Sequence, residues 1–179
     1  TETMERFIDL LKKLITIPSF SSEEEEAAGV IRNFLADEKI GFYTKQNNTW
    51  AYNRYFDNNK PTILLNSHID TVRPSISYSK NPFEPVEEGD RLYGLGSNDA
   101  GAPLISLLAT FIHFFQREDL GFNLIFAATA EEEISGDNGL EIVLPELPPV
   151  KFAIIGEPTR MSLAVAEKGL LILDCYAHG

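Results

Sequence analysis

Acidic and imidazole side chains closely follow three apolar segments of the sequence. Each segment is a short run without charge, and the run at 124–128 is typical of a strand that is buried on both faces. Ligands of open α/β sheets bind just beyond the carboxyl ends of the strands, so side chains at these positions are candidates for chemistry. They are His68 and Asp70 after 62–66, Glu131, Glu132 and Glu133 after 124–128, and Glu157 after 152–155.

A bound cation would explain why so many acidic side chains gather at one edge of a sheet. Asp99, at a predicted junction between a loop and a helix, adds a further carboxylate to the set. Four or more carboxylates in one pocket repel one another strongly unless a cation lies between them. One imidazole among several carboxylates suits Zn²⁺, Mn²⁺ or Co²⁺ better than Ca²⁺ or Mg²⁺. Two metals that share a bridging carboxylate would use this set economically.

Two of these patterns also have a structural interpretation. In His68-x-Asp70 the two residues share a face of an extended segment, so the carboxylate could fix the imidazole tautomer; a purely structural pair at a strand end would look the same. Three consecutive glutamates alone are typical of a solvated helix start. The glutamates at 23–26 are interpreted in that way, as a first helical turn with no catalytic role.

Hydrophobic periodicity and turn residues predict the elements that must position these side chains. Helices are predicted over 3–16, from a capping box at Ser22–Glu25 to a stop at Gly41, over 101–116 and over 137–144. Strands are predicted at 42–45 and 50–56, forming a hairpin across 47–48, and at 62–66, 124–128, 152–155 and 169–176. The helix at 101–116 is apolar nearly all round, so we expect it to be deeply buried. The strand ends can converge if the sheet is mostly parallel.

Composition restricts the class of protein. The chain has 179 residues and a net charge of −12, which argues against nucleic acid or an anionic membrane surface as the main partner. No apolar run approaches the roughly 18 residues of a membrane span, and the N-terminal residues do not resemble a signal peptide. The single cysteine, Cys175, fits a reducing compartment, so we expect a cytoplasmic protein in which this thiol is buried.

Four motifs, in order, resemble the dizinc aminoacylase and carboxypeptidase family of metallopeptidases, which includes acetylornithine deacetylase and succinyl-diaminopimelate desuccinylase. They are S-H-I-D-T-V at 67–72, Y-G-L-G-S-N-D-A-G-A at 93–102, T-A-E-E-E at 129–133 and I-I-G-E-P-T at 154–159. The resemblance implies a three-layer α/β/α fold with a mostly parallel central sheet. It also implies that 1–166 form the N-terminal part of a zinc-peptidase catalytic domain and that 167–179 lead into a lid and dimerisation domain.

The same resemblance implies a role for each candidate residue and two zinc ions as cofactors, with Co²⁺ or Mn²⁺ as alternatives. His68, Asp99 and Glu157 would hold the first zinc, with Asp99 bridging to a second zinc held by Glu133. Glu132 would be the general acid/base and Asp70 would orient the histidine; Glu131 has no assigned role. The family's final histidine ligand is expected beyond this chain, because neither His113 nor His178 fits its pattern. We therefore expect this chain alone to bind one metal better than two and to hydrolyse poorly.

The reaction implied by the resemblance is hydrolysis of the amide bond of a small N-acyl amino acid. The stretches 96–102, 156–159 and 166–171 most resemble acetylornithine deacetylase, which implies N-acetyl- or N-succinyl-ornithine or citrulline as substrate, arginine biosynthesis as context and a homodimer. A desuccinylase or dipeptidase with the same metal centre is the alternative enzyme. An inactive metal-binding or interaction domain is the alternative outside the enzyme class.

Overall fold

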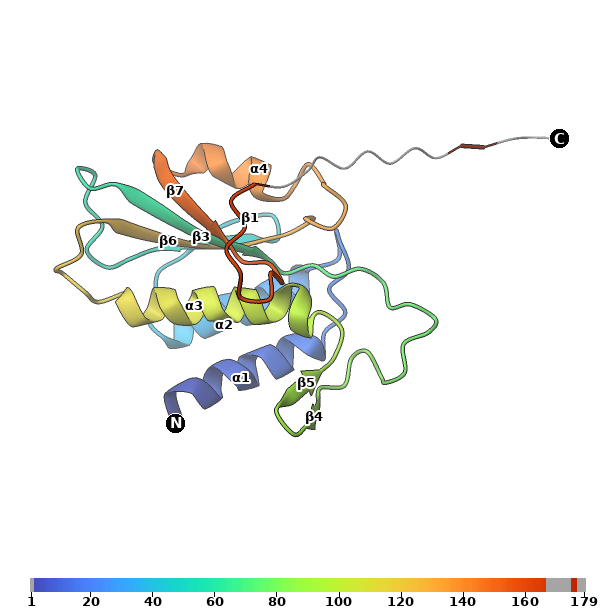
Figure 1. Cartoon of the computed structure of the whole chain (residues 1–179). Helices are drawn as coiled ribbons and strands as arrows, with labels where there is room; N and C mark the ends of the chain where they lie inside the picture. The colour runs from blue at the N-terminus through green and yellow to red at the C-terminus, as the bar shows by residue number, and fades with distance from the viewer. Residues whose placement is uncertain (1, 167–174, 177–179) are drawn as a thin grey trace.

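The computed structural model describes residues 2–166 and 175–176, in which a five-stranded sheet lies between helices (Figure 1). The strand order is β1-β2-β6-β3-β7, and among these strands only β2 runs against the common direction. The strands are β1 (Tyr43–Lys45), β2 (Asn48–Tyr52), β3 (Thr62–His68), β6 (Asn123–Thr129) and β7 (Val150–Ile155), with β4 (Val86–Glu88) and β5 (Arg91–Tyr93) in a separate hairpin.

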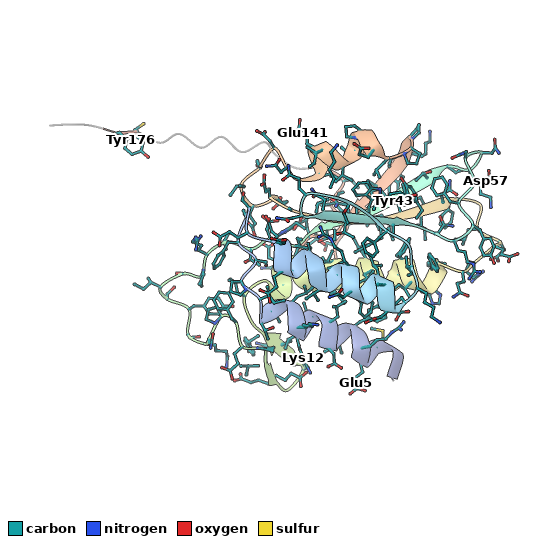
Figure 2. All side chains as sticks on the ribbon, turned by 180° about the vertical axis from the view of Figure 1, so that it is seen from behind. Glu5, Lys12, Tyr43, Asp57, Glu141 and Tyr176 are labelled. Atoms are coloured by element: carbon teal, nitrogen blue, oxygen red, sulfur yellow. The ribbon has the colours of Figure 1, made fainter. Side chains whose placement is uncertain are left out.

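Helices cover both faces of this sheet. The longer ones, α1 (Glu2–Ile15), α2 (Glu25–Asp37) and α3 (Ala102–Phe114), lie on one face, and the short α4 (Leu140–Val143) lies on the other (Figure 1). Figure 2 shows Lys12 on α1 and Glu141 on α4 on opposite sides of the sheet. The predicted α/β fold with a mostly parallel central sheet is therefore confirmed.

The core is centred on β6, whose residues are all buried. Leu124, Phe126 and Ala128 pack on the side of the three long helices, whereas Ile125 and Ala127 pack on the side of α4. Successive side chains of a strand point to opposite faces, so an apolar run without alternation fits a strand covered on both sides. This is the pattern from which the strand was predicted.

The predicted capping box at the start of α2 is wrong. Ser22 has a left-handed backbone (φ 70°), and its hydroxyl donates to the carboxylate of Glu131. The helix begins only at Glu25, and no side chain caps it. A partner more than a hundred residues away thus takes the hydroxyl that the local spacing assigned to the helix.

The end of α2 also differs from the prediction of a stop at Gly41. Lys39 adopts the left-handed conformation (φ 59°), and its N–H donates to the carbonyl of Ala36. The next N–H, of Ile40, donates to the carbonyl of Leu35. These two bonds form a Schellman motif around Lys39, so the helix ends at Asp37, four residues before the glycine.

Two further elements are present with different extents. The β1–β2 hairpin turns at 46–47 rather than 47–48, and the helix predicted at 137–144 is limited to α4 with one 3₁₀ turn at Leu144–Glu146. The helix α3 is not deeply buried all round, because it forms an outer layer with one face exposed. Its exposed stripe is Ser106, Thr110 and His113.

The strand predicted at 169–176 and the expected boundary at 166/167 fall mostly outside the described residues. Cys175 is described and is exposed, so the expectation of a buried thiol is wrong. Burial would need a neighbouring strand or helix, which the described part of the chain does not place over it. None of the described helices is both long and apolar enough to span a bilayer.

We predict that Phe126→Ala lowers the free energy of unfolding by about 3–5 kcal/mol, because it empties a fully buried site. The ring of Phe126 packs on Phe111 at a centroid distance of 5.9 Å. The matched control is Phe152→Ala on β7, where 56% of the residue is exposed and the expected change is about 0.5 kcal/mol or less. Urea unfolding followed by circular dichroism measures both, and equal losses would contradict the placement of the core.

Candidate metal centre

The carboxyl ends of β3, β6 and β7 lie side by side in parallel register. His68, at the end of β3, pairs with Thr129 at the end of β6. On the other side of β3, Asn66 pairs with Ile155, and its carbonyl accepts the N–H of Gly156 at 2.8 Å. The residues that follow these three strands therefore share one edge of the sheet.

The imidazole of His68 lies among the acidic side chains at this edge. Its Nε2 is 3.2 Å from Oδ1 of Asp99 and 3.8 Å from Oε2 of both Glu132 and Glu157. Ligand atoms lie within 4.8 Å of one another in two triplets, His68–Asp99–Glu133 and His68–Glu132–Glu157. The structure therefore brings together the histidine and all four carboxylates proposed as ligands or base. Neither triplet is the expected first site, which combined His68 with Asp99 and Glu157.

Asp70 is buried behind the imidazole and has two sets of contacts. Nδ1 of His68 donates to the main-chain carbonyl of Asp70 (2.9 Å) and lies 3.3 Å from its carboxylate, which leaves Nε2 directed at the acidic side chains. The carboxylate also accepts the N–H groups of Glu132 and Glu133, each at 3.1 Å, and the hydroxyl of Ser21 at 2.8 Å. Asp70 thus connects the histidine to the loop after β6, which its spacing from His68 alone does not reveal.

Asp99 comes from a single wide turn before α3. The backbone at Ser97–Gly101 forms a π-helical turn that departs from helical geometry at Asp99 (φ −118°, ψ 101°), and the Asp99–Ala100 peptide bond is cis. Gly96 precedes this turn with φ 73°, a conformation that glycine adopts without steric cost. The carboxylate of Asp99 remains more than half exposed, so it is accessible to a ligand from solvent.

The loop after β6 gives the three consecutive glutamates different directions. Glu131 has a left-handed backbone (φ 55°), and its carboxylate accepts the hydroxyl of Ser22 and the main-chain N–H of Asn138, each at 3.0 Å. Gly136 makes room for it, because a Cβ there would lie 2.2 Å from Oε2 of Glu131. Only the next two glutamates reach the imidazole.

The pKa values of two glutamates at the site reflect their burial and the repulsion between carboxylates. Burial and the neighbouring acids raise the pKa of Glu157 to about 7, against the opposing effect of His68. Burial and Asp99 likewise raise the pKa of Glu133. Burial lowers the pKa of His68, but the carboxylates around it prevail and raise it to about 9. A cation between these groups would relieve the repulsion.

The donor set fits divalent transition metals. The site offers one imidazole nitrogen with a fixed tautomer and four carboxylates within reach of it, the ligand types that Zn²⁺, Mn²⁺ and Co²⁺ accept. The second ring nitrogen is held by a carbonyl, as is usual for a histidine that binds a metal. The side chains present can therefore hold such a metal at His68, and a second ion would be held by carboxylates alone, because one imidazole nitrogen binds only one metal.

A pocket of about 400 Å³ opens beside the imidazole. It lies between the loop after β6, the start of α4 and the end of β7, and both Glu132 and Glu157 line it. No lysine or arginine is among the described residues that line it. Its other polar lining residues are Asn66, Thr129, Glu131, Ser135 and Glu141.

Sequence reasoning missed Glu24, which was interpreted as part of a solvated helical turn. The residue is fully buried (0% exposed), and its carboxylate accepts the N–H of Ser22 (2.6 Å), the side-chain amide of Asn47 (2.8 Å) and the N–H of Glu131 (3.2 Å). Four consecutive glutamates are equivalent in a helical pattern, so spacing alone provides no signal that singles out this one.

Curated relatives match nearly the whole chain. A peptidase M20 domain-containing protein of Schizosaccharomyces pombe is 29% identical over 98% of this chain and 44% of its own length. A LysW-lysine/LysW-ornithine hydrolase of Sulfurisphaera tokodaii is 34% identical over 96% of this chain and 45% of its own. The chain thus spans less than half the length of these relatives.

Solved structures share the fold. An M20 metallo-carboxypeptidase of Sulfolobus solfataricus superposes with a TM-score of 0.68 at 23% identity, over 87% of this chain and 37% of that one. A dinuclear metal-binding peptidase of Bacillus subtilis gives 0.65 at 22% identity, over 86% of this chain and 42% of that one. The sequence model of peptidase family M20/M25/M40 matches residues 64–168, more than half of the chain. The chain therefore belongs to peptidase family M20/M25/M40.

Proposed function

We propose that the protein hydrolyses the amide bond of an N-acyl amino acid, with two metal ions bound around His68. The observation that carries this proposal is the convergence of one imidazole and four carboxylates beside an accessible pocket. Hydrolysis of an amide needs a polarised carbonyl, an activated water and a proton for the departing amine. Bound metals would supply the first of these and lower the pKa of the water.

Within this proposal, the side chains of the chain divide into ligands and a proton carrier. His68 offers Nε2, and Asp99, nearest to it at 3.2 Å, is suited to bridge two metals. Glu132 would take the proton from the attacking water and deliver it to the leaving amine. The pocket supports this choice, because its lining includes Glu132 but not Glu133, whose ligand atom groups with Asp99 instead.

We propose a basic amino acid, foremost ornithine, as the amine product. The pocket lining has several carboxylates and, among its described residues, no lysine or arginine, which favours a substrate side chain with positive charge. Relatives from Sulfurisphaera tokodaii and Pyrococcus abyssi, each 34% identical, are named a LysW-lysine/LysW-ornithine hydrolase and a putative LysW-lysine/LysW-ornithine hydrolase, respectively. Acetylornithine or succinylornithine deacylation in cytoplasmic arginine biosynthesis, by a homodimer, is the specific form of the proposal.

Peptide hydrolysis is the second candidate. A relative in Paracoccidioides lutzii, 33% identical over 80% of this chain, is named a probable carboxypeptidase. Human carnosine dipeptidase 1 shares the fold with a TM-score of 0.66. A panel of acetyl-, succinyl- and aminoacyl-ornithine, assayed on the full-length protein, separates the candidates by their kcat/KM values.

We predict that Glu132→Ala in the full-length protein lowers kcat by about 10²- to 10⁴-fold, as expected for loss of a general acid/base, with unchanged metal content. Glu133→Ala is expected to remove one metal per chain as well. Steady-state kinetics and elemental analysis measure both effects. Glu118→Ala, beyond the far end of α3, is the control. Near-normal turnover of the Glu132 variant would show that the base is another residue.

We predict that chelation abolishes turnover and that Zn²⁺, Co²⁺ or Mn²⁺ restores it. A metal at a hundredfold excess over its Kd should stabilise the fold by about 2.7 kcal/mol, measured by thermal unfolding with and without metal. Equilibrium dialysis should show that this chain alone binds one ion more tightly than a second. Two equally tight zinc ions per chain would contradict this expectation, and the absence of any bound metal would favour an inactive domain.

We predict that Glu141→Gln lowers the preference for Nα-acetylornithine over the neutral Nα-acetylnorvaline by about two- to fivefold in kcat/KM, the range of an exposed ion pair. Glu141 is exposed at the start of α4, where it lines the pocket. Glu146→Gln is the control, because this residue follows α4 but does not line the pocket. An unchanged ratio would show that the pocket does not receive the amino-acid side chain.

A further inference from the structure

The loop after β6, residues 130–139, is called the acidic loop. Three of its successive main-chain N–H groups donate to buried carboxylates outside the loop. The N–H of Glu131 donates to Oε1 of Glu24 at 3.2 Å. The N–H groups of Glu132 and Glu133 donate to the two oxygens of Asp70, each at 3.1 Å. The main chain is thus hydrogen-bonded at each of residues 131–133. Glu24 and Asp70, which accept these bonds, therefore set the directions of the three glutamate side chains.

Of these acceptors, Glu24 belongs to the segment 19–24, which lies between α1 and α2, and Asp70 is hydrogen-bonded to that segment. Ser21 donates its hydroxyl to Asp70, and the carbonyl of Ser19 accepts the N–H of Thr71, so the segment runs along the end of β3. Ser22 donates its hydroxyl to the carboxylate of Glu131. The segment therefore contacts the ends of β3 and β6, two of the three strand ends that supply the candidate site.

The side chain of Glu24 does not cap the helix that follows it. It precedes α2, where a carboxylate ordinarily accepts N–H groups of the first turn, yet its side chain makes no such bond. It turns inward, is fully buried and accepts three neutral donors instead. A carboxylate is costly to bury unless it is hydrogen-bonded, so this position calls for a strong acceptor.

The backbone conformation of Glu131, whose N–H donates to Glu24, is uncommon. Glu131 is left-handed (φ 55°), as is Ser135 further along the loop (φ 49°). Residues other than glycine rarely adopt this conformation, and they keep it at functional sites only where surrounding contacts impose it. Removing the acceptor would free the loop to relax, which would swing the carboxylates of Glu132 and Glu133 away from His68.

We propose that Glu24 is a positioning residue of the candidate metal centre. By holding the main chain of Glu131, it aims Glu132 and Glu133 at the imidazole, and so affects metal binding and proton transfer more than substrate binding. Its effect on turnover rests on the proposed function. Its effect on the loop and on metal binding does not.

The test compares Glu24→Ala with Glu24→Gln and with Glu25→Ala in the full-length protein. Glu25 is the matched control, because it is the adjacent glutamate in the first turn of α2 and is exposed. Glutamine keeps an oxygen for the N–H groups of Ser22 and Glu131, and a flip of the Asn47 amide can pair with its nitrogen. It should therefore rescue the alanine variant.

Three readouts are expected to change together in Glu24→Ala. The value of kcat should fall by about 10- to 100-fold, the range for loss of a group that orients a ligand, while KM changes less than about threefold. The affinity for Co²⁺ should fall by about tenfold with an altered visible spectrum. Amide hydrogens of 131–133 should exchange faster than in the wild type, and Glu25→Ala should change none of these.

Two results would overturn the proposal. The first is a Glu24→Ala protein whose cobalt spectrum and amide protection at 131–133 match the wild type. The second is faster exchange throughout the chain, with kcat and KM changed alike and no rescue by glutamine, which would mean a general structural role. If the wild type hydrolyses no amide, the proposed function fails, and amide exchange with the cobalt titration decides the role of Glu24. If the wild type binds no metal either, amide exchange at 131–133 in Glu24→Ala alone decides whether Glu24 positions the loop.

Discussion

The parallel pairing of β3 with β6 and β7 is the constraint on which the rest of this structure depends. It brings His68 level with the end of β6 and places Gly156, at the exit of β7, against β3. The central strands β3 and β6 are buried on both faces, so helices must cover them on both sides, whereas β7 at the edge of the sheet is largely exposed. The same pairing gathers acidic side chains at one edge, where they repel one another. The packing of the core and the electrostatics of the site therefore have one origin.

The buried and half-buried acids at this edge belong to two groups. Asp70, Glu24 and Glu131 are surrounded by N–H and O–H donors, and such bonds hold the pKa of Asp70 below its usual value although burial opposes this. Glu133 and Glu157 have raised pKa values because burial and like charges dominate around them. Acids of the first group shape the backbone, whereas those of the second have the electrostatic character expected around a bound cation.

Most of the site could be predicted because its signals are local. An uncharged run such as 124–128 identifies a strand buried on both faces, and the acids after it must then lie at the sheet edge. Glu24 could not be identified, since its bonds depend on residues from distant elements and its neighbours in sequence are also glutamates. Ser22 was misassigned for the same reason, because a capping box and a tertiary hydrogen bond use the same hydroxyl. Burial of α3 was overestimated, since composition does not show which side of a helix meets the sheet.

The bonds between 19–24 and the acidic loop also have a consequence for folding. They join residues 107 and 109 positions apart in sequence, and the bond from Ser21 to Asp70 spans 49. Contacts of such separation form late, because the chain must close a long loop before they stabilise anything. The acidic loop therefore depends for part of its geometry on contacts with a distant segment of the chain. We expect the docking of residues 19–24 to complete this part of the site, so that its assembly belongs to a late step of folding.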